Sequence, residues 1–523
     1  MRRKISLKLL LGMTLVLLTF FLVNPIGFQS GPFKAQPAHA GFFDDDLDVF
    51  DEVLELVADN YVYPPDFKKL FTAAIDAMVK TVEKENIAVT SVYSGKTLET
   101  NGKKFSYRLS FNKDENMQAL QGVYDFISRE LKGKVSKKDL EKAGIDGLMG
   151  SLDPYSLYMD KDEFEASMRD TEGQYGGVGM VITLVDNQLT VVRVLKNSPS
   201  ARAGILPQDI ITRVSGQDIK GMQIHELAAK LRGYPNTQVE IDVYRPSTKV
   251  TQLTTLTREI ISIETVQYKY LGDRTGYISI SSFSKQTNDQ LEEALKKGEE
   301  DGVQAFVLDL RDNPGGLLSQ SVKVASHFLE EGQLVVYTQG RDRNDTQQYD
   351  SVYDDRWSRK PLAVLINSHS ASASEIVSGS LKDAGKALIL GERSYGKGSV
   401  QTIFRMSDSS GLRLTTSKYY TPSGIDITVH GIVPEILIER DITGLPNDTP
   451  SDKPKDAKAP IVKPIVVKES ELQKFLKKRK ETINDDTDLL VAFAKMAINN
   501  PPQPTKGHAL AKARELAEDM HHY

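Results

Sequence analysis

The 523-residue chain contains no cysteine. Disulfide bonds, cysteine-based zinc sites, cysteine nucleophiles and a lipidated N-terminal cysteine are therefore excluded. The 8 histidines include no H-E-x-x-H motif and no clustered metal-ligand spacing. The formal net charge is −5, so no excess of basic residues points to nucleic acid. Apolar residues make up 40%, which is enough for sizeable cores, and the length suggests three or four domains.

A single long apolar run lies near the N-terminus, at residues 9–23, after the basic Arg2, Arg3 and Lys4. It is shorter than the roughly 20 residues of a membrane span, and Ala38 and Ala40 form a small-x-small cleavage motif. We expect residues 1–40 to be a signal peptide or an uncleaved anchor. The protein would then be exported to the periplasm or cell envelope, with membrane anchoring left open.

The remaining patterns predict an α/β protein of several domains. Helical spacing predicts a mainly helical N-terminal region over residues 41–172, with short strands or an inserted loop at 87–112. Apolar strand-like segments alternate with helix-like stretches over residues 259–442, which indicates βα units with a largely parallel sheet. A linker rich in proline and aspartate at 443–465 precedes a helical C-terminal tail at 466–523. This tail could dock on the core or on a second subunit.

Residues 173–258 are predicted to form short strands separated by turns, with one helix at about 224–231. This order, with the glycine turn at 176–180 and the segment at 203–210, resembles a PDZ domain. The resemblance implies that a peptide is added as an extra strand and that backbone N–H groups hold its terminal carboxylate. The implied peptide-binding residues are Gly177, Val178, Gly179, Met180, Ile182, Leu227 and Arg232. The alternative for the apolar ones is an ordinary place in the core, and for Arg232 an ion pair within the protein.

Three serines alternate with alanine between a strand-like segment at 362–367 and a helix-like one at 375–386: Ser370, Ser372 and Ser374. A serine hydroxyl at such a turn lies where helix-terminal N–H groups can stabilise an oxyanion. Lys397, between two glycines on a later loop, can approach it as a base. Spacing does not choose among the serines, because a serine near a helix start is commonly an N-cap.

Lys397 can act as a base only if its pKa falls from ~10.4 to ~7.5, which requires roughly 4 kcal/mol of disfavoured charge. We therefore expect a buried amine with few carboxylates around it. Gln401 could orient that amine without raising its pKa. Residues 391–397 also match the start of a P-loop, but Gly398 stands where the Mg²⁺-binding Ser or Thr is needed. A solvated surface lysine is the plainer alternative.

A glycine turn at residues 313–316 ends a strand-like segment. Gly315 or Gly316 could bring a backbone N–H close to a substrate carbonyl. The alternative is an ordinary turn beside an ordinary ion pair of Asp309 and Arg311. His430 offers a second mechanism, a Ser-His-Asp triad with an unidentified carboxylate.

Together these segments resemble, in order, the C-terminal processing (tail-specific) serine peptidases. The matching residues are 153–158, 198–211, 309–316, 370–375, 391–401 and 416–424. The resemblance implies Ser372 as nucleophile, Lys397 as general base and Gln401 as its orienting residue. The amides of Ala373 and of Gly315 or Gly316 would form the oxyanion hole. Residues 85–112 look like an insertion, and Glu435 stands where the family usually has aspartate.

We thus predict an exported serine endopeptidase that binds C-terminal tails of proteins and cleaves through an acyl-enzyme. No metal or cofactor is expected, and a regulatory adaptor and a homo-oligomer stay open. A PDZ scaffold with an inactive peptidase fold is the first alternative, although a scaffold would not need every catalytic residue type. An anchored envelope-assembly factor is the second, and only the long segment before Ala40 supports it.

Overall fold

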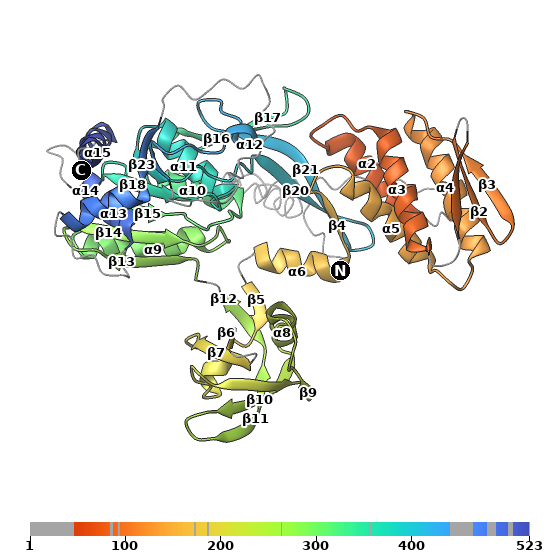
Figure 1. The fold of residues 1–523 in the computed structure, drawn as a ribbon, viewed down its shortest axis with the longest axis horizontal. Coiled ribbons are helices and arrows are strands. Elements are labelled where there is room, and N and C mark those ends of the chain that lie inside the picture. Colours follow the sequence, from red (N-terminus) through yellow and green to blue (C-terminus); the bar gives the residue numbers. More distant parts are fainter. Residues whose placement is uncertain are drawn as a thin grey trace, which may run out of the picture. The chain divides into compact units, whose positions relative to one another are not determined.

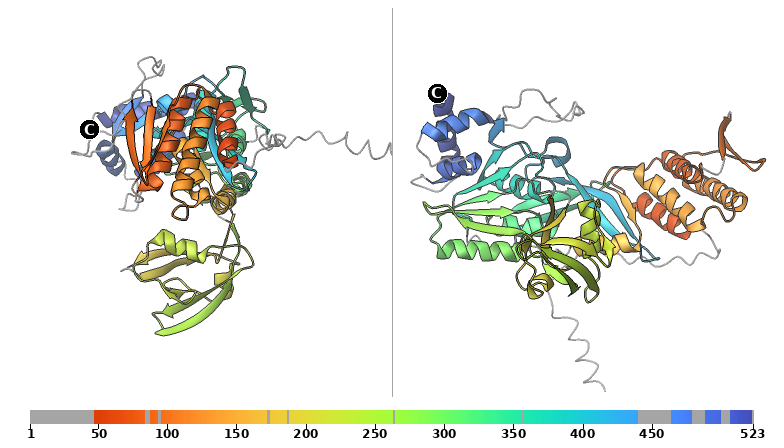
Figure 2. Two further views of the ribbon diagram at one scale, coloured as in Figure 1. Left: turned by 90° about the vertical axis from the view of Figure 1, so that its right-hand side faces the viewer. Right: turned by 60° about the horizontal axis from the view of Figure 1, so that its bottom comes forward.

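The computed structural model describes residues 47–83, 87–92, 95–171, 174–185, 188–262, 264–354, 357–439, 464–478, 488–499 and 506–521. The predicted signal peptide or anchor at 1–40 and nearly all of the predicted linker lie outside these residues. No helix within them is both long and apolar enough to cross a membrane. Figures 1 and 2 show an α/β architecture with several sheets.

The N-terminal region combines helices with a small antiparallel sheet. Its helices follow the predicted apolar spacing, and Phe50, Val53, Leu54 and Val57 form the buried stripe of the first one. The sheet comes from the residues predicted as short strands or an inserted loop. The elements are α2 (Asp48–Asn60), α3 (Phe67–Thr81), β1 (Ala88–Val92), β2 (Gly95–Thr100), β3 (Lys103–Tyr107), α4 (Lys113–Glu130), α5 (Lys137–Gly150), β4 (Leu157–Met159) and α6 (Lys161–Thr171).

The next unit has PDZ architecture. Its sheet runs in the order β11-β10-β8-β7-β6, so β6 is an edge strand, and α8 contacts it. A separate ladder pairs β5 with β12, which extends the unit beyond the expected end at residue 258. The elements are β5 (Gln174–Gly177), β6 (Met180–Val185), β7 (Gln188–Val194), α7 (Pro199–Arg202), β8 (Ile210–Val214), β9 (Gln217–Asp218), α8 (Ile224–Leu231), β10 (Gln238–Arg245), β11 (Val250–Thr257) and β12 (Glu259–Ser262).

The core is a 7-stranded sheet in the order β13-β14-β15-β18-β19-β22-β23. All neighbouring pairs are parallel except β13 with β14, in agreement with the predicted βα units. The elements are β13 (Val266–Tyr270), β14 (Thr275–Ile280), α9 (Thr287–Glu300), β15 (Ala305–Asp309), α10 (Leu318–Ser326), β18 (Leu362–Ile366), α11 (Ala373–Asp383), β19 (Ala387–Gly391), β22 (Ile436–Glu439) and β23 (Ile465–Lys468).

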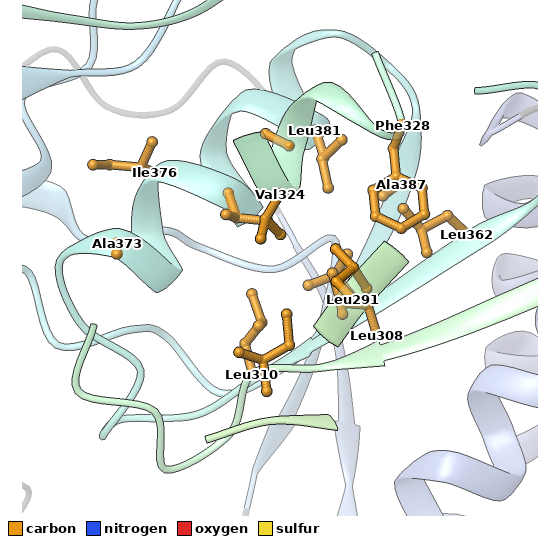
Figure 3. Close-up of a cluster of buried hydrophobic side chains, with 14 of the residues drawn as sticks. Leu291, Leu308, Leu310, Val324, Phe328, Leu362, Ala373, Ile376, Leu381 and Ala387 are labelled. Atoms are coloured by element: carbon orange, nitrogen blue, oxygen red, sulfur yellow. The ribbon is translucent and has the colours of Figure 1, made fainter. Parts of the chain in front are cut away.

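The two faces of this sheet are covered by different parts of the chain. Alternate residues of β18 point to opposite faces, because successive side chains of a strand alternate. Val364 and Ile366 pack with residues of α9, α10 and α11. Figure 3 shows this cluster, with Ala373 and Ile376 of α11 among the labelled side chains.

The C-terminal tail covers the other face. Ala363 and Leu365 of β18 pack with Phe475 and Phe493 of the tail helices. These helices are α13 (Glu469–Lys478), α14 (Leu489–Ile498) and α15 (Lys506–His521), and β23 adds a strand to the sheet just before them. The expected division between core and tail at 443–465 therefore separates two parts of one folded unit.

A second, antiparallel sheet in the order β17-β16-β21-β20 carries the loop of Lys397. Its elements are β16 (Leu334–Gln339), β17 (Thr346–Asp350), β20 (Ser399–Arg405) and β21 (Gly411–Tyr420), with α12 (Ile427–His430) after them. The N-terminal region attaches here, since β4 pairs with β21. Arg341 also donates to the carbonyls of Ala58 and Tyr61 at the end of α2. Residues of the N-terminal region therefore reach the site described next.

Candidate active site

Ser372 occupies a sharp turn between β18 and α11. It is the N-cap of α11, with φ 54° and ψ −113°. Such a backbone costs an L-residue about 1–3 kcal/mol and is kept only where the surroundings enforce it. The preceding Ala371 donates its N–H to the carbonyl of Asn313 at 3.0 Å, which holds this turn on the glycine loop.

The three alternating serines have different environments. Ser370 is fully buried and its hydroxyl donates to the carbonyl of Leu310 at 2.8 Å. Ser374 is also fully buried and donates to the carbonyl of Asn313 at 3.0 Å. Ser372 is half-buried and thus partly accessible. These contacts favour Ser372 among the three serines, because the hydroxyls of Ser370 and Ser374 already donate to backbone carbonyls.

The Glu375 carboxylate joins the serine turn to the lysine loop. Its Oε2 accepts the backbone N–H groups of Ser372 at 2.8 Å and Lys397 at 2.9 Å. Its Oε1 accepts the N–H of Gly396 at 2.7 Å and the hydroxyl of Ser394 at 2.5 Å. Burial raises the pKa of this carboxyl, and the hydrogen bonds oppose that shift. Glu375 is therefore a buried hub on which both loops are fastened.

The Lys397 amine is half-buried and lies over an aromatic ring. Its Nζ is 5.0 Å from the ring centroid of Tyr155, a residue of the N-terminal region. Burial, with the nearby Arg413 guanidinium, lowers the pKa of this amine below its ordinary value, while Glu375 opposes the shift. The direction of the pKa agrees with the expectation, but the amine is half-buried rather than buried and Glu375 lies near it. Within the described part of the chain the amine has no hydrogen-bond acceptor, and Ser372 is not bonded to it.

Gln401 lies near the lysine loop but is bonded elsewhere. Its Nε2 donates to the hydroxyl of Ser399 at 2.9 Å and to that of Thr415 at 3.4 Å. The Thr415 hydroxyl in turn donates to Asp153 at 3.1 Å. The orienting role expected for Gln401 therefore stays a prediction that requires its amide to turn toward Lys397.

The glycine turn lies against the serine turn. A Cβ added to Gly315, whose φ is +100°, would lie 2.8 Å from the Cβ of Ser372 and 2.9 Å from the N of Ala373. The N–H of Gly315 already donates to Asn313 Oδ1 at 2.9 Å. The N–H groups of Gly316 and Ala373 have no acceptor among the described residues. One of these two unoccupied donors directly follows Ser372, and the other directly follows the glycine that lies against Ser372.

His430, the histidine that the sequence singled out, does not form a triad among the described residues. Within the described part of the chain, no carboxylate is bonded to the ring of His430, whose carbonyl accepts from Arg393 at 2.7 Å. His369 is exposed, and its Nδ1 lies 3.3 Å from Asp312. The described residues likewise contain no group of three or more acidic residues or histidines that could hold a metal ion.

The PDZ loop leaves two backbone donors unused. The carbonyl of Val178 accepts from Ser200, and that of Gly179 accepts from Leu195 and Ser198. The N–H groups of Val178 and Gly179 have no acceptor among the described residues. They lie between the buried Gly177 and β6, the edge strand. A terminal carboxylate could accept from both.

The apolar residues expected to line the peptide pocket are largely core residues. Leu227 is fully buried, Met180 is 8% exposed, and both belong to the PDZ core, with Ile182 packed against it. Arg232 is exposed at the end of α8. Among these side chains, Ile182 and Arg232 are the most accessible to a peptide.

Three residues beside the site carried no predicted role: Glu375, Asn313 and Tyr155. The Ser-x-x-Glu spacing of Ser372 and Glu375 is that of a capping box and could have indicated the contact between them. Asn313 and Tyr155 lie in the noticed segments 309–316 and 153–158, but their contacts join residues far apart in sequence. Local patterns could not indicate those contacts.

Residues 274–438 match Peptidase family S41, and residues 190–245 match a PDZ domain. Residues 83–163 match the N-terminal domain of the activating protease CtpB. The interpretation of residues 85–112 as an insertion is therefore wrong, because that segment belongs to a domain known from a related protease.

Two relatives support the same assignment, and one solved structure is reported with them. The chain is 36% identical over 358 residues to a carboxy-terminal-processing protease of Bartonella bacilliformis, covering 68% of this chain and 80% of the relative. It is 37% identical over 326 residues to a probable CtpA-like serine protease of Staphylococcus aureus, covering 62% and 65%. The solved photosystem II D1 C-terminal processing protease is 26% identical with a TM-score of 0.41, covering 76% of this chain and 93% of that one. The chain belongs to peptidase family S41, as a C-terminal processing serine protease with a PDZ domain.

Proposed function

We propose that this protease is an exported endopeptidase that uses Ser372 as nucleophile and Lys397 as general base. The observation that carries the proposal is the shared Glu375 carboxylate, which fastens the backbone of both residues. The half-buried Ser372 and the lowered pKa of the Lys397 amine are consistent with these roles.

Acylation starts with transfer of the Ser372 hydroxyl proton to the Lys397 amine as Oγ attacks the scissile carbonyl carbon. The carbonyl oxygen becomes an oxyanion, which accepts from the N–H groups of Ala373 and Gly316. Gly315 is the less suitable donor, because its N–H already donates to Asn313.

Collapse of this intermediate breaks the C–N bond, and the Lys397 ammonium gives its proton to the leaving amine. The acyl-enzyme is then attacked by water, with Lys397 again taking the proton, and Ser372 is regenerated. Gln401 would orient the amine during these steps, after exchanging its bonds to Ser399 and Thr415.

The PDZ domain would recognise the C-terminal tail of a protein or peptide substrate. The terminal carboxylate accepts from the N–H groups of Val178 and Gly179, and the peptide pairs with the edge strand β6. Export rests on the sequence of residues 1–40 alone and places the protease in the periplasm or cell envelope. An adaptor, a homo-oligomer and membrane association are compatible with this function.

The test is cleavage of an unfolded reporter protein with an apolar C-terminus. Lys397→Ala and Ser372→Ala should each abolish turnover. Lys386→Ala removes a surface lysine that pairs with Glu330, and it serves as the matched control that should retain turnover. Normal cleavage by Lys397→Ala would refute Lys397 as the general base. Absence of cleavage by the wild-type protein would favour the alternative of a PDZ scaffold with an inactive peptidase fold.

A further inference from the structure

The ring of Tyr155 takes a position that the mechanism leaves unexplained. It comes from the N-terminal region, yet it faces the amine of Lys397 at 5.0 Å. A cation within about 6 Å of an aromatic ring centroid is attracted to the face of that ring. In the same structure the amine makes no hydrogen bond to Ser372.

The backbone that carries Tyr155 is held on the core. Asp153 Oδ1 accepts the N–H groups of Tyr155 at 2.8 Å and Ser156 at 3.0 Å, which forms a tight turn. The same oxygen accepts the hydroxyl of Thr415 on β21 at 3.1 Å. The turn is thereby attached to the strand that pairs with β20, where Gln401 lies opposite Thr415.

The phenol end of the side chain lies close to Tyr395, on the loop that leads to Lys397. Burial, and then this neighbouring phenol, raise the pKa of the Tyr155 hydroxyl. The backbone of Tyr155 is thus fixed by the turn, and its side chain lies beside the lysine loop.

The other charged groups that face Lys397 come from two elements. Arg413 on β21 disfavours the ammonium, and Glu375 on α11 favours it. Tyr395 on the lysine loop and Asp153, which accepts the N–H of Tyr155, are further titratable groups near this contact. The ring acts in the same direction as Glu375, because its negative face favours the charged form of the amine.

We propose that Tyr155 is a positioning residue for the general base: its ring holds the Lys397 ammonium in the resting enzyme, and the amine must leave the ring to reach Ser372. The proposal rests on the Ser372 and Lys397 roles proposed above. It makes the N-terminal region part of the control of catalysis, since displacement of the 153–156 turn would release the base.

The first test is the pH dependence of kcat/KM for Tyr155→Leu, Tyr155→Phe and Tyr155→Trp. Leucine removes the aromatic face, so the acid limb should move to lower pH by about half to one unit. Phenylalanine keeps the face and loses only the hydroxyl, so the limb should stay in place. Tryptophan offers a stronger face and should move the limb to higher pH.

Two results would overturn the proposal. A uniform loss of kcat/KM in Tyr155→Leu with an unmoved acid limb would assign Tyr155 a structural role. Equal shifts in the Leu and Phe variants would assign the effect to the hydroxyl. If Tyr155→Leu does not fold, as judged by circular dichroism, the Phe and Trp variants still decide the matter, because an unmoved limb is expected for Phe and a limb at higher pH for Trp.

A second readout separates this proposal from the catalytic assignment. Carbon-13 labelling of lysine side chains in the Ser372→Ala protein allows the Lys397 titration to be followed by NMR, with Lys397→Arg identifying the signal. Loss of the ring should lower the titration midpoint without any need for turnover. Full activity of Lys397→Ala would refute the catalytic role, whereas an unmoved midpoint would refute the ring contact.

Discussion

The backbone N–H groups of Ser372 and Lys397 donate to the same carboxylate oxygen, Oε2 of Glu375, at 2.8 and 2.9 Å. A fully buried side chain therefore sets the spacing between the serine turn and the lysine loop. The contact also uses the positive end of α11, where a carboxylate in the first turn is stabilised.

Replacement of this carboxylate should uncouple the two loops. Glu375→Gln presents an amide NH₂ to at least one pair of donors, and each buried donor left unsatisfied costs about 1–3 kcal/mol. We expect kcat/KM to fall at least about a hundredfold, as for a small misplacement of catalytic groups. Ser394→Ala removes a single donor to Oε1, and also the acceptor of the Ile432 N–H, so it should lower kcat/KM clearly less than Glu375→Gln. Equal effects of the two substitutions would contradict the hub role.

A side chain at Gly315 should block the site. An alanine Cβ there would lie 2.6 Å from the carbonyl of Ala371 and 2.8 Å from the Cβ of Ser372. Gly315→Ala should abolish turnover and lower the melting temperature. The control is Gly385→Ala, which has φ +68° and open space around the added Cβ. It should cost about 1 kcal/mol in stability and leave kcat/KM unchanged.

The half-buried amine of Lys397 should lower the stability of the folded protein at neutral pH. Because the pKa of Lys397 is lowered on folding, the unfolded chain binds more protons between the two pKa values, and stability of the wild type rises with pH across that window. Lys397→Met should therefore abolish turnover yet stabilise the protein at neutral pH, by about 1 kcal/mol for this partly hydrated group. The gain should shrink as the pH approaches ~10.4. Urea titrations at pH 7 and pH 10 would measure it, and a constant difference would disagree with a lowered pKa.

The PDZ loop can be tested at Gly179. Its φ is +73°, and an added Cβ would lie 2.2 Å from the Cβ of Ser198. Gly179→Ala should distort the carboxylate loop and raise KM about tenfold or more for a substrate with a free C-terminus. A substrate with an amidated C-terminus should lose affinity for the wild type and respond little to the substitution. Gly204→Ala has the same φ in open space and controls for backbone strain.

The tail should contribute to the stability of the core. Phe475 of α13 is 2% exposed and packs in the cluster below the sheet. Phe475→Ala should lower the free energy of unfolding by about 3–5 kcal/mol. Its neighbour Lys474 is exposed, and Lys474→Ala should change the free energy by no more than about 0.5 kcal/mol. Similar values for the two variants would mean that the tail does not pack as described.

Much of the fold was predictable because its elements carry strong local patterns. The helix expected at 224–231 corresponds to α8, and the strand-like segment at 362–367 corresponds to β18. The sheet of β16, β17, β20 and β21 was missed. Its long strands mix polar and apolar residues because much of their surface is half-buried, so they show no clear alternation.

Part of the site could likewise be predicted from residue types and their order. Ser372, Lys397 and the glycine turn were found because each motif is local. The sequence could not distinguish Gly315 from Gly316 as the candidate oxyanion-hole donor. The difference between them arises from Asn313 Oδ1, which accepts the N–H of Gly315. The sequence did not show which of the expected peptide-pocket residues are accessible, because the burial of Leu227 depends on packing across the whole PDZ core.

The sequence by itself determined many of the secondary-structure elements, the family and the candidate catalytic residues, because these depend on local spacing and on side-chain chemistry. Tertiary structure alone decided which serine is accessible, which amides are unoccupied, that Glu375 joins two loops, and that Tyr155 faces Lys397. Tertiary structure also decided the position of the C-terminal tail, since its helices cover one face of the core sheet. Each of these depends on contacts between residues far apart in the chain, and such contacts form only when the chain is folded.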